Sequence, residues 1–188
     1  MSILLALLLI LQETDSQSPP AAPAPTVISG PLTIAASTEK KILVVRIGPY
    51  DVKKYDVAVG TKAHPTPMGR FVVRHMIWNP AWAPPNAGWA RGKQPTPPGH
   101  PKNPMRAVKI FFNEPDYYIH GTNQEDSIGY AASHGCIRMT EADATDLGRY
   151  LMTHTGLEKD DDWFANVFSS DKQTDIRLPH GVSFAIGR

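Results

Sequence analysis

Residues 119–139 read IHGTNQEDSIGYAASHGCIRM and contain Cys136, the only cysteine in the chain. A single thiol cannot form an internal disulfide, so this sulfur is a buried apolar filler, an intermolecular link or a reactive group. A polar loop separates Cys136 from His120, which ends an expected strand. We expect this loop to bring the two segments together, so that the histidine approaches the sulfur from a neighbouring strand.

Two histidines are candidates for activating the thiol. A thiol reacts as its thiolate, and a nearby imidazole lowers the thiol pKa from ~8.5. His134 lies two residues before Cys136, and side chains at that spacing share one face of an extended segment. His120 lies sixteen residues before Cys136 and would shuttle protons from a separate strand.

The residues next to the cysteine also suit acyl transfer. Gly135 has no side chain, so a substrate carbonyl could approach the backbone closely there. The backbone amides of Gly135 and Cys136 are candidate donors to a developing oxyanion. Arg138 shares a face with Cys136 if the segment is extended, and its guanidinium can bind a carboxylate through two hydrogen bonds.

Three other interpretations stay open. The cysteine could be inert and buried, with unrelated histidines nearby. His120, His134 and Cys136 could bind zinc with an open fourth position, but the chain lacks paired Cys or His spacings and an obvious carboxylate ligand, so we predict no metal. Arg138 could pair with a carboxylate and brace the loop instead of binding a ligand. The remaining histidines are predicted to be surface or loop residues: His64, His75, His100, His154 and His180.

Outside this stretch, short runs rich in β-branched residues alternate with turns that contain Gly and Pro. One clear helix follows the cysteine, because Thr140 and Asp143 form a start signal and Gly156 supplies the stop. We therefore predict a mostly β fold, a sandwich or barrel, with one clear α-helix. The predicted strands, of which the second and third form a hairpin, are residues 33–36, 41–47, 52–59, 71–74, 107–112, 117–120 and 182–186.

The long segment 78–105 is rich in Pro and Gly and carries Trp78, Trp82 and Trp89. A loop of this length in a compact domain is usually functional or disordered, and the aromatic residues argue against disorder. Tryptophans in such a loop pack against the domain more often than they bind ligands. We therefore predict an ordered loop with packed tryptophans.

The 188-residue chain is long enough for one domain and a tail, and its formal net charge of +1 gives no reason to predict nucleic-acid binding. Residues 3–11 form an apolar run too short to cross a bilayer. The run resembles the hydrophobic region of a secretory signal, although no Lys or Arg precedes it, and a Pro- and Ala-rich spacer follows. We predict that residues 1–30 are an export segment and membrane tether, and that residues 31–188 form one exported domain, periplasmic or associated with the cell wall. A misplaced start or an uncleaved anchor is the alternative for the first segment.

Residues 119–139 resemble the signature of the bacterial L,D-transpeptidase catalytic domain. That signature has a His-Gly pair, a spacer and then Ser/Thr-His-Gly-Cys, followed by an apolar residue and Arg or Asn. The segments PTPMGRFVV, NPAWAPP, PPGHPKNPM and HGVSFAI are similar to other parts of this family, so the resemblance covers roughly residues 31–188. The chain departs from the family pattern in two places. Arg106 replaces the usual glycine after NPM, and TGLEKDDDWF occupies the place of the usual Gly-Thr-Pro-Val.

The resemblance implies a β-rich catalytic domain that needs no cofactor and acts on peptidoglycan stem peptides. Its thiolate would attack the carbonyl at the L-centre of diaminopimelate in a tetrapeptide stem and release the terminal D-alanine, and an amine would then resolve the thioester. A hydrolase on the same scaffold and a non-catalytic wall-binding module are the rival interpretations. By this resemblance, Cys136 would be the nucleophile and His120 the proton carrier, with the Gly121 carbonyl orienting the His120 ring. The residues that would support the site and its oxyanion are Gly121, His134 and Gly135. The residues that would bind the substrate are Ser133, Arg138 and Tyr118.

Overall fold

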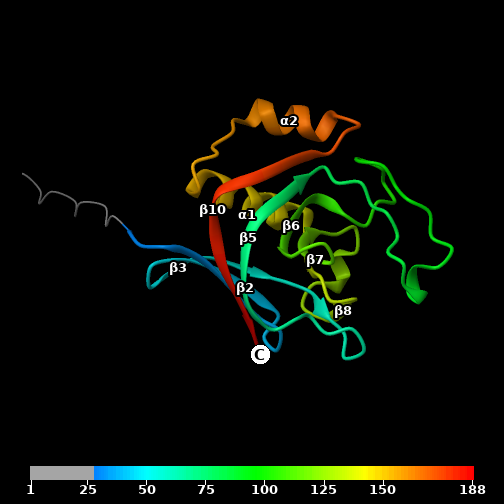
Figure 1. Ribbon diagram of the computed structural model, residues 1–188, viewed down its shortest axis with the longest axis horizontal. Helices are drawn as coiled ribbons and strands as arrows, with labels where there is room; N and C mark the ends of the chain where they lie inside the picture. Colours follow the sequence, from blue (N-terminus) through cyan, green and yellow to red (C-terminus); the bar gives the residue numbers. More distant parts are fainter. Residues whose placement is uncertain (1–27) are drawn as a thin grey trace, which may run out of the picture.

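The computed structural model describes residues 28–188, so the predicted export segment and most of the tether lie outside the described residues. Its main element is an eight-stranded sheet with the order β3-β2-β1-β10-β5-β6-β7-β9, which curls into a barrel-like form (Figure 1). The predicted mostly β class is confirmed. The strands of this sheet are β1 (Leu32–Ser37), β2 (Ile42–Ile47), β3 (Tyr50–Asp56), β5 (Gly69–Trp78), β6 (Arg106–Asn113), β7 (Tyr117–Gly121), β9 (Ile137–Met139) and β10 (Thr174–Gly187). A second, two-stranded sheet pairs β4 (Val59–Gly60) with β8 (Ala131–Ser133).

The sheet is mixed, and its long strands form the centre of the molecule. β5 and β10 run antiparallel and side by side, as Figure 1 shows in green and red. β10 also pairs parallel with β1, and β2 pairs antiparallel with β3, which confirms the predicted hairpin. Val182, Phe184 and Ile186 alternate with exposed residues along β10, so one face of this strand enters the core.

Helix α1 (Glu141–His154) covers the sheet behind β6 and β7. The hydroxyl of Thr140 accepts a hydrogen bond from the Asp143 backbone N–H at 3.0 Å, which confirms the predicted start signal. The helix buries one apolar stripe, in which Ala144, Leu147 and Leu151 are fully buried. Because α1 follows β9 directly, its packing holds in place the strand that carries Arg138.

A second helix, α2 (Asp161–Ser169), corrects the prediction of one clear helix. The carboxylate of Asp160 accepts a hydrogen bond from the Trp163 backbone N–H at 2.8 Å and caps the helix. Phe164 and Val167 are buried on its inner face, next to the fully buried Trp78 at the end of β5. α2 spans only nine residues, so too few apolar positions recur for its periodicity to be recognised in the sequence. In Figure 1 it lies above the upper part of β10.

The segment between β5 and β6 is an ordered loop with packed tryptophans, as predicted, although Trp78 itself ends β5. Trp82 is buried and pairs through its backbone with Thr96, which closes part of the loop. Trp89 lies in a short 3-10 helix, η1 (Gly88–Ala90), and is half-buried. A further 3-10 helix, η2 (Glu125–Ser127), interrupts the polar loop between β7 and β8.

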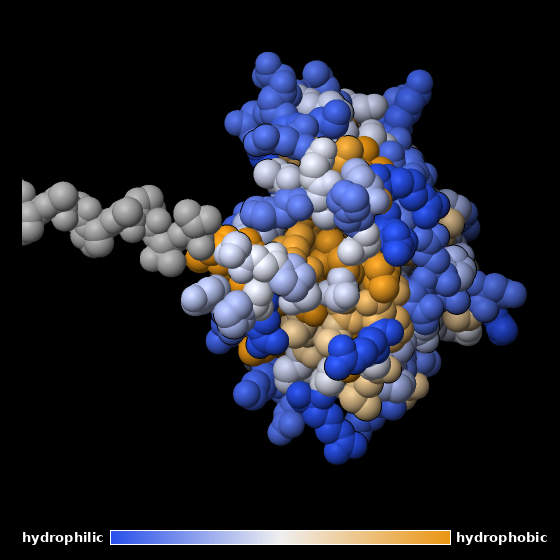
Figure 2. All heavy atoms as spheres, turned by 60° about the vertical axis from the view of Figure 1, so that its left-hand side comes forward, coloured by the Kyte–Doolittle hydropathy of each residue, from blue (hydrophilic) through white to orange (hydrophobic). Residues whose placement is uncertain are grey.

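Figure 2 shows the side of the molecule from which the described chain begins. Hydrophobic residues reach the surface in the middle of this face, and hydrophilic residues surround them. Single exposed apolar side chains are ordinary on a folded domain. Within residues 28–188 no helix is both long and apolar enough to cross a bilayer. The predicted membrane tether therefore concerns only residues outside the described part of the chain.

Candidate active site

The two ends of the 119–139 stretch lie next to each other in the sheet. β7 and β9 pair in parallel, with Ile119 opposite Ile137 and His120 opposite Arg138. Tyr118 and Cys136 precede these pairs by one step, and the phenol hydrogen-bonds to the sulfur. The polar loop thus joins the two strands as the sequence predicted, because parallel neighbours need a connection that returns to the start of the strand.

Cys136 lies half-buried at the start of β9. Its Sγ donates a hydrogen bond to the backbone carbonyl of Asp116 at 3.4 Å. Burial raises the pKa of the thiol, while hydrogen bonds from Tyr118 and the positive charges of Lys109 and Arg138 lower it in part. The resting thiol is therefore protonated, but the groups around it favour a thiolate once the proton leaves.

His120 is buried at the end of β7, and its Nδ1 lies 2.8 Å from the Gly121 carbonyl oxygen. A carbonyl only accepts hydrogen bonds, so Nδ1 carries the proton and Nε2 keeps its lone pair. Burial is the main cause that lowers the pKa of His120 to about 3; the hydrogen bond with the Gly121 carbonyl opposes this shift, and the nearby cations Arg138 and Lys109 add to it. The ring is neutral at pH 7 and can accept a proton at Nε2.

No hydrogen bond joins His120 to Cys136 within the described residues, but the two groups share their surroundings. Tyr118 packs edge-on against the His120 ring, with ring centroids 5.5 Å apart, and hydrogen-bonds to the sulfur. Lys109 and Arg138 influence the pKa of both groups. The imidazole, the thiol and two cations therefore form one cluster.

Two glycines at the site leave no space for a side chain. A Cβ on Gly135, whose φ is +112°, would lie 2.7 Å from the Tyr117 ring. A Cβ on Gly121 would lie 2.6 Å from the Arg106 carbonyl oxygen on β6. Both contacts are too close for any other residue, so these glycines let the turn before Cys136 and the end of β7 pack tightly.

Ser133 braces the turn that precedes Cys136. Its buried hydroxyl donates to the Cys136 carbonyl oxygen at 2.5 Å and accepts from the Gly135 N–H at 3.1 Å. The Gly135 amide is thus engaged inside the turn, in contrast to the expectation that it faces an oxyanion. The Ser133 hydroxyl likewise bonds within the protein, whereas the sequence predicted a contact with substrate.

His134 points toward the long loop. It is exposed, and its ring stacks on Trp89 with a centroid distance of 4.0 Å and lies 4.9 Å from the His64 ring. The pKa of His134 is lowered mainly by its slight burial. The nearby charges that lower it further are those of His64, Arg138 and Lys93. Its contacts are those of a residue that shapes the loop. His64 lies exposed in a loop, as predicted, and packs beside His134.

Arg138 lies half-buried, two residues after Cys136. Its Nη1 donates to the Gln124 side-chain oxygen at 3.0 Å, and its backbone pairs with Ala58. Within residues 28–188 no ion pair involves Arg138. Arg138 therefore does not brace the loop by pairing with a carboxylate, which was the alternative interpretation. The remaining guanidinium donors suit an anionic ligand.

Comparison with known proteins agrees with this arrangement. Residues 32–159 match the model of the L,D-transpeptidase catalytic domain. The chain belongs to this family. It is 32% identical over 136 residues to the L,D-transpeptidase YkuD of Bacillus subtilis, covering 72% of this chain and 69% of that protein. A Bacillus licheniformis relative of the same name is 34% identical over 125 residues, and this match covers 66% of the chain but 63% of the relative.

Solved L,D-transpeptidases share the fold. L,D-transpeptidase 3 of Mycobacterium tuberculosis matches with a TM-score of 0.51 at 13% identity, over 84% of this chain and 61% of that one. The L,D-transpeptidase of Xylanimonas cellulosilytica matches with a TM-score of 0.50 at 17% identity, over 88% and 64%. At such identities the likeness concerns the fold alone.

Lys109 is a site residue that sequence reasoning missed in this L,D-transpeptidase domain. It lies on β6 opposite His120, with its Nζ 5.1 Å from the Tyr118 ring centroid and 3.2 Å from the Ala81 carbonyl oxygen that accepts its hydrogen bond. Burial lowers the pKa of Lys109, and the nearby Cys136 opposes that change. The sequence did contain a signal for Lys109, because a charged residue inside an apolar run such as AVKIFF is unusual.

His75 corrects the prediction made for this histidine. It was expected at the surface, but it is buried on β5 between the carboxylates of Glu114 and Asp175. Within residues 28–188, no group of three or more His, Cys, Asp or Glu side chains has the arrangement of a metal site.

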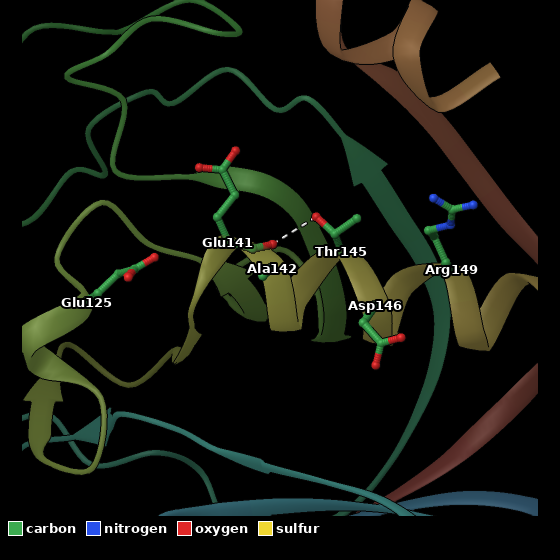
Figure 3. Close-up of a pocket in the computed structure, with 6 residues that line it drawn as sticks. All are labelled: Glu125, Glu141, Ala142, Thr145, Asp146 and Arg149. Atoms are coloured by element: carbon green, nitrogen blue, oxygen red, sulfur yellow. Dashed lines mark hydrogen bonds between the residues drawn. The ribbon is translucent and has the colours of Figure 1, made fainter. Parts of the chain in front are cut away.

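One surface hollow lies away from the thiol. It lies along α1, and Figure 3 shows Glu141, Asp146 and Arg149 projecting from the helix, with Glu125 contributed by the loop. None of the predicted site residues lines this hollow, and its residues are mostly charged. The predicted site residues lie instead on β7, at the end of β8, on β9 and in the turn that precedes β9.

Proposed function

We propose that this chain is a cysteine-dependent L,D-transpeptidase that transfers an acyl group from a peptidoglycan tetrapeptide stem to an amine. The observation that supports it best is the parallel pairing of β7 and β9. This pairing sets the neutral His120, with its Nδ1 proton held by Gly121, in the same cluster as Cys136. A buried base and a half-buried thiol with two cations nearby form the arrangement that nucleophilic catalysis needs.

The proposed first step couples proton transfer to attack. Since burial favours both the neutral thiol and the neutral imidazole, a thiolate–imidazolium pair is not the resting state. Nε2 of His120 takes the thiol proton as Sγ attacks the carbonyl at the L-centre of the diaminopimelate residue. The tetrahedral intermediate then collapses, and the leaving D-alanine amine takes the proton from His120. The product is a thioester on Cys136.

In the second step the proton transfers run in the reverse direction. An acceptor amine attacks the thioester carbonyl and gives a proton to His120. Collapse expels the Cys136 thiolate, which recovers that proton and restores the starting state. Tyr118 donates to the sulfur, and Lys109 and Arg138 lie close enough to lower its pKa, so the thiolate is stabilised when it leaves.

Arg138 and Lys109 also give the proposed site a positive potential. The stem peptide carries carboxylates, and a guanidinium with one donor on Gln124 has further donors for such a group. We propose that Arg138 binds an anionic part of the stem. We also propose that residues 31–188 form the catalytic domain and that residues 1–30 serve export, because the wall substrate lies outside the cytoplasmic membrane.

A hydrolase remains the second candidate, because water could resolve the same thioester. The decisive experiment incubates the purified domain with a tetrapeptide muropeptide, with and without an acceptor amine, and follows the products by mass spectrometry. Transfer predicts a new amide with loss of D-alanine, and hydrolysis predicts the tripeptide alone. Cys136→Ser should lose both reactions while keeping the same circular dichroism spectrum. Turnover by this variant would remove the nucleophile assignment.

A further inference from the structure

His75 occupies an unusual place for a histidine outside the proposed catalytic pair. Its side chain is only 8% exposed, and both ring nitrogens face carboxylate oxygens. Nδ1 lies 3.0 Å from Glu114 and Nε2 lies 2.8 Å from Asp175. Both ring nitrogens of His75 are therefore within hydrogen-bond distance of a carboxylate. Arg177 also donates to Glu114, at 3.3 Å.

One connection runs from His75 to the nucleophile through the turn between β6 and β7. Glu114, the residue held by His75, lies in this turn two residues before Asp116. The Asp116 carbonyl oxygen accepts the hydrogen bond from the Cys136 thiol at 3.4 Å. A shift of the turn at Glu114 would therefore move the carbonyl that contacts the sulfur.

A second connection runs through aromatic rings. The His75 ring stacks on Phe111, with centroids 4.7 Å apart and an interplanar angle of 12°. The Phe111 ring in turn packs edge-on against Tyr118 at 5.3 Å. Tyr118 hydrogen-bonds to the sulfur and thereby lowers the pKa of the Cys136 thiol. Both connections end at groups that touch Sγ.

We propose that His75 is a positioning residue for Cys136. It holds the β6–β7 turn through Glu114 and the Tyr118 ring through Phe111, and so keeps the Asp116 carbonyl and the Tyr118 donors against the sulfur. This inference rests on the proposed nucleophilic role of Cys136. His75 itself touches neither the sulfur nor His120.

The test measures the reactivity of the thiol directly. Cys136 is the only cysteine, so alkylation by iodoacetamide, followed by mass spectrometry, reports on one site. His75→Phe keeps a ring to stack on Phe111 and removes both hydrogen bonds, while Glu114 and Asp175 are half-exposed and can be solvated. His154→Phe is the matched control, since His154 also stacks on an aromatic ring, that of Tyr150, on the exposed surface of α1.

We expect His75→Phe to speed alkylation by roughly threefold to tenfold at neutral pH, the effect of losing one neutral hydrogen bond. The variant keeps a ring against Phe111 but releases the Asp116 carbonyl, an acceptor that stabilises only the protonated thiol, so the midpoint of its rate against pH should move downward. His154→Phe should react within about twofold of the wild-type chain, as surface changes usually do. A normal rate and midpoint in a folded His75→Phe variant would refute the proposal.

A second pair of variants distinguishes a specific effect on the β6–β7 turn from a general loss of stability. Glu114→Ala releases the turn but leaves His75 bonded to Asp175, and Asp175→Ala leaves the turn bonded to His75. The proposal predicts that Glu114→Ala speeds alkylation more than Asp175→Ala does, because only Glu114→Ala releases the turn that carries the Asp116 carbonyl. A purely stabilising ion cluster would make the two carboxylates equivalent, so equal rates, or a faster Asp175→Ala, would overturn it. A wild-type thiol no more reactive than free cysteine would count against the proposed function, whereas the ratio between these variants tests His75 separately.

Discussion

At the scale of single residues, burial decides how the proposed site handles protons. His120 and Cys136 are both kept neutral by their surroundings, so neither alone is the charged reagent that acyl transfer needs. The ions form only when a substrate carbonyl takes up the negative charge as the thiol loses its proton. Lys109 and Arg138 are the fixed charges that reduce the cost of the thiolate at that moment.

The two histidines near Cys136 should therefore behave differently when they are replaced. We predict that His120→Ala loses most acylation and slows iodoacetamide labelling of Cys136 at neutral pH, because the site loses its base. His134→Ala should stay close to normal in labelling, since its ring packs on Trp89. Rates of acyl-enzyme formation by mass spectrometry compare the two variants. An inactive His134→Ala beside a near-normal His120→Ala would contradict this assignment.

Arg138 allows a test that separates ligand binding from scaffolding. A lysine cannot reproduce the two parallel hydrogen bonds of a guanidinium with a carboxylate. Losing a charge-assisted hydrogen bond of ~1.5–3 kcal/mol should lower kcat/KM on natural stems by roughly tenfold to a hundredfold.

Arg138→Lys should at the same time leave alkylation of Cys136 by a small uncharged reagent unchanged. A parallel fall in both rates would identify Arg138 as part of the scaffold, through its bond to Gln124. Gln124→Ala is the companion control, because it removes that bond and keeps the guanidinium.

At the scale of elements, α1 and the strands before it carry the site. Arg106 at the start of β6 departs from the family pattern, and it donates to Glu141 of α1 at 2.9 Å. The departure therefore links the sheet to the first turn of the helix. α1 begins immediately after β9, so fraying at this end would reach the strand that holds Arg138.

The Thr140 cap should contribute measurably to stability. We predict that Thr140→Ala lowers the free energy of unfolding by ~1 kcal/mol, because the Asp143 N–H loses its partner at the helix start. Urea denaturation followed by circular dichroism measures it. Thr153→Ala, an exposed threonine in the last turn of the same helix, is the control and should change little. Equal losses of the free energy of unfolding in the two variants would show that the Thr140 cap makes no specific contribution to stability.

Local signals in the sequence predicted most strands, α1 and the pairing of the two segments that carry His120 and Cys136. Those predictions succeeded because each depends on a short pattern, such as the Thr140–Asp143 start signal. β10 was predicted only at residues 182–186, since its first half contains Pro179, Gly181 and several polar residues. Its pairing with β5 has an irregularity between Arg177 and Val182 and continues on both sides of it. The neighbouring strand β5 supports the strand there, and the sequence of β10 alone does not show this.

The site residues that were missed or misplaced depend on contacts between distant parts of the chain. His75 is buried by Glu114 and Asp175, and neither carboxylate is near it in sequence. Lys109 reaches the site because β6 pairs with β7 opposite His120. The Gly135 amide turned out to be engaged because Ser133 folds back on the turn. Apart from the lysine inside the apolar run AVKIFF, tertiary contacts of this kind leave no pattern in one sequence.

At the scale of the whole molecule, the buried neutral His120 links folding to pH. Its pKa falls from the ordinary value of 6.5 to about 3 in the folded state, mainly through burial. Between these two values the unfolded chain binds more protons at this position than the folded chain, so protons favour unfolding there. The contribution of His120 to stability is complete above pH 6.5, and it is lost progressively as the pH falls toward 3.

We therefore predict that His120→Gln, which cannot titrate, loses less stability than the wild-type chain when the pH is lowered from 7 to 4. The two chains should be compared by thermal unfolding at each pH, and the quantity of interest is the difference in the drop of Tm. His154→Gln is the control, since His154 lies exposed on α1 and its replacement should leave the drop unchanged. A drop as large in His120→Gln as in the wild-type chain would mean that other groups govern the acid sensitivity. It would also remove the reason for treating His120 as a neutral base throughout the physiological range, because the same buried, neutral state underlies both its stability effect and its proposed role in catalysis.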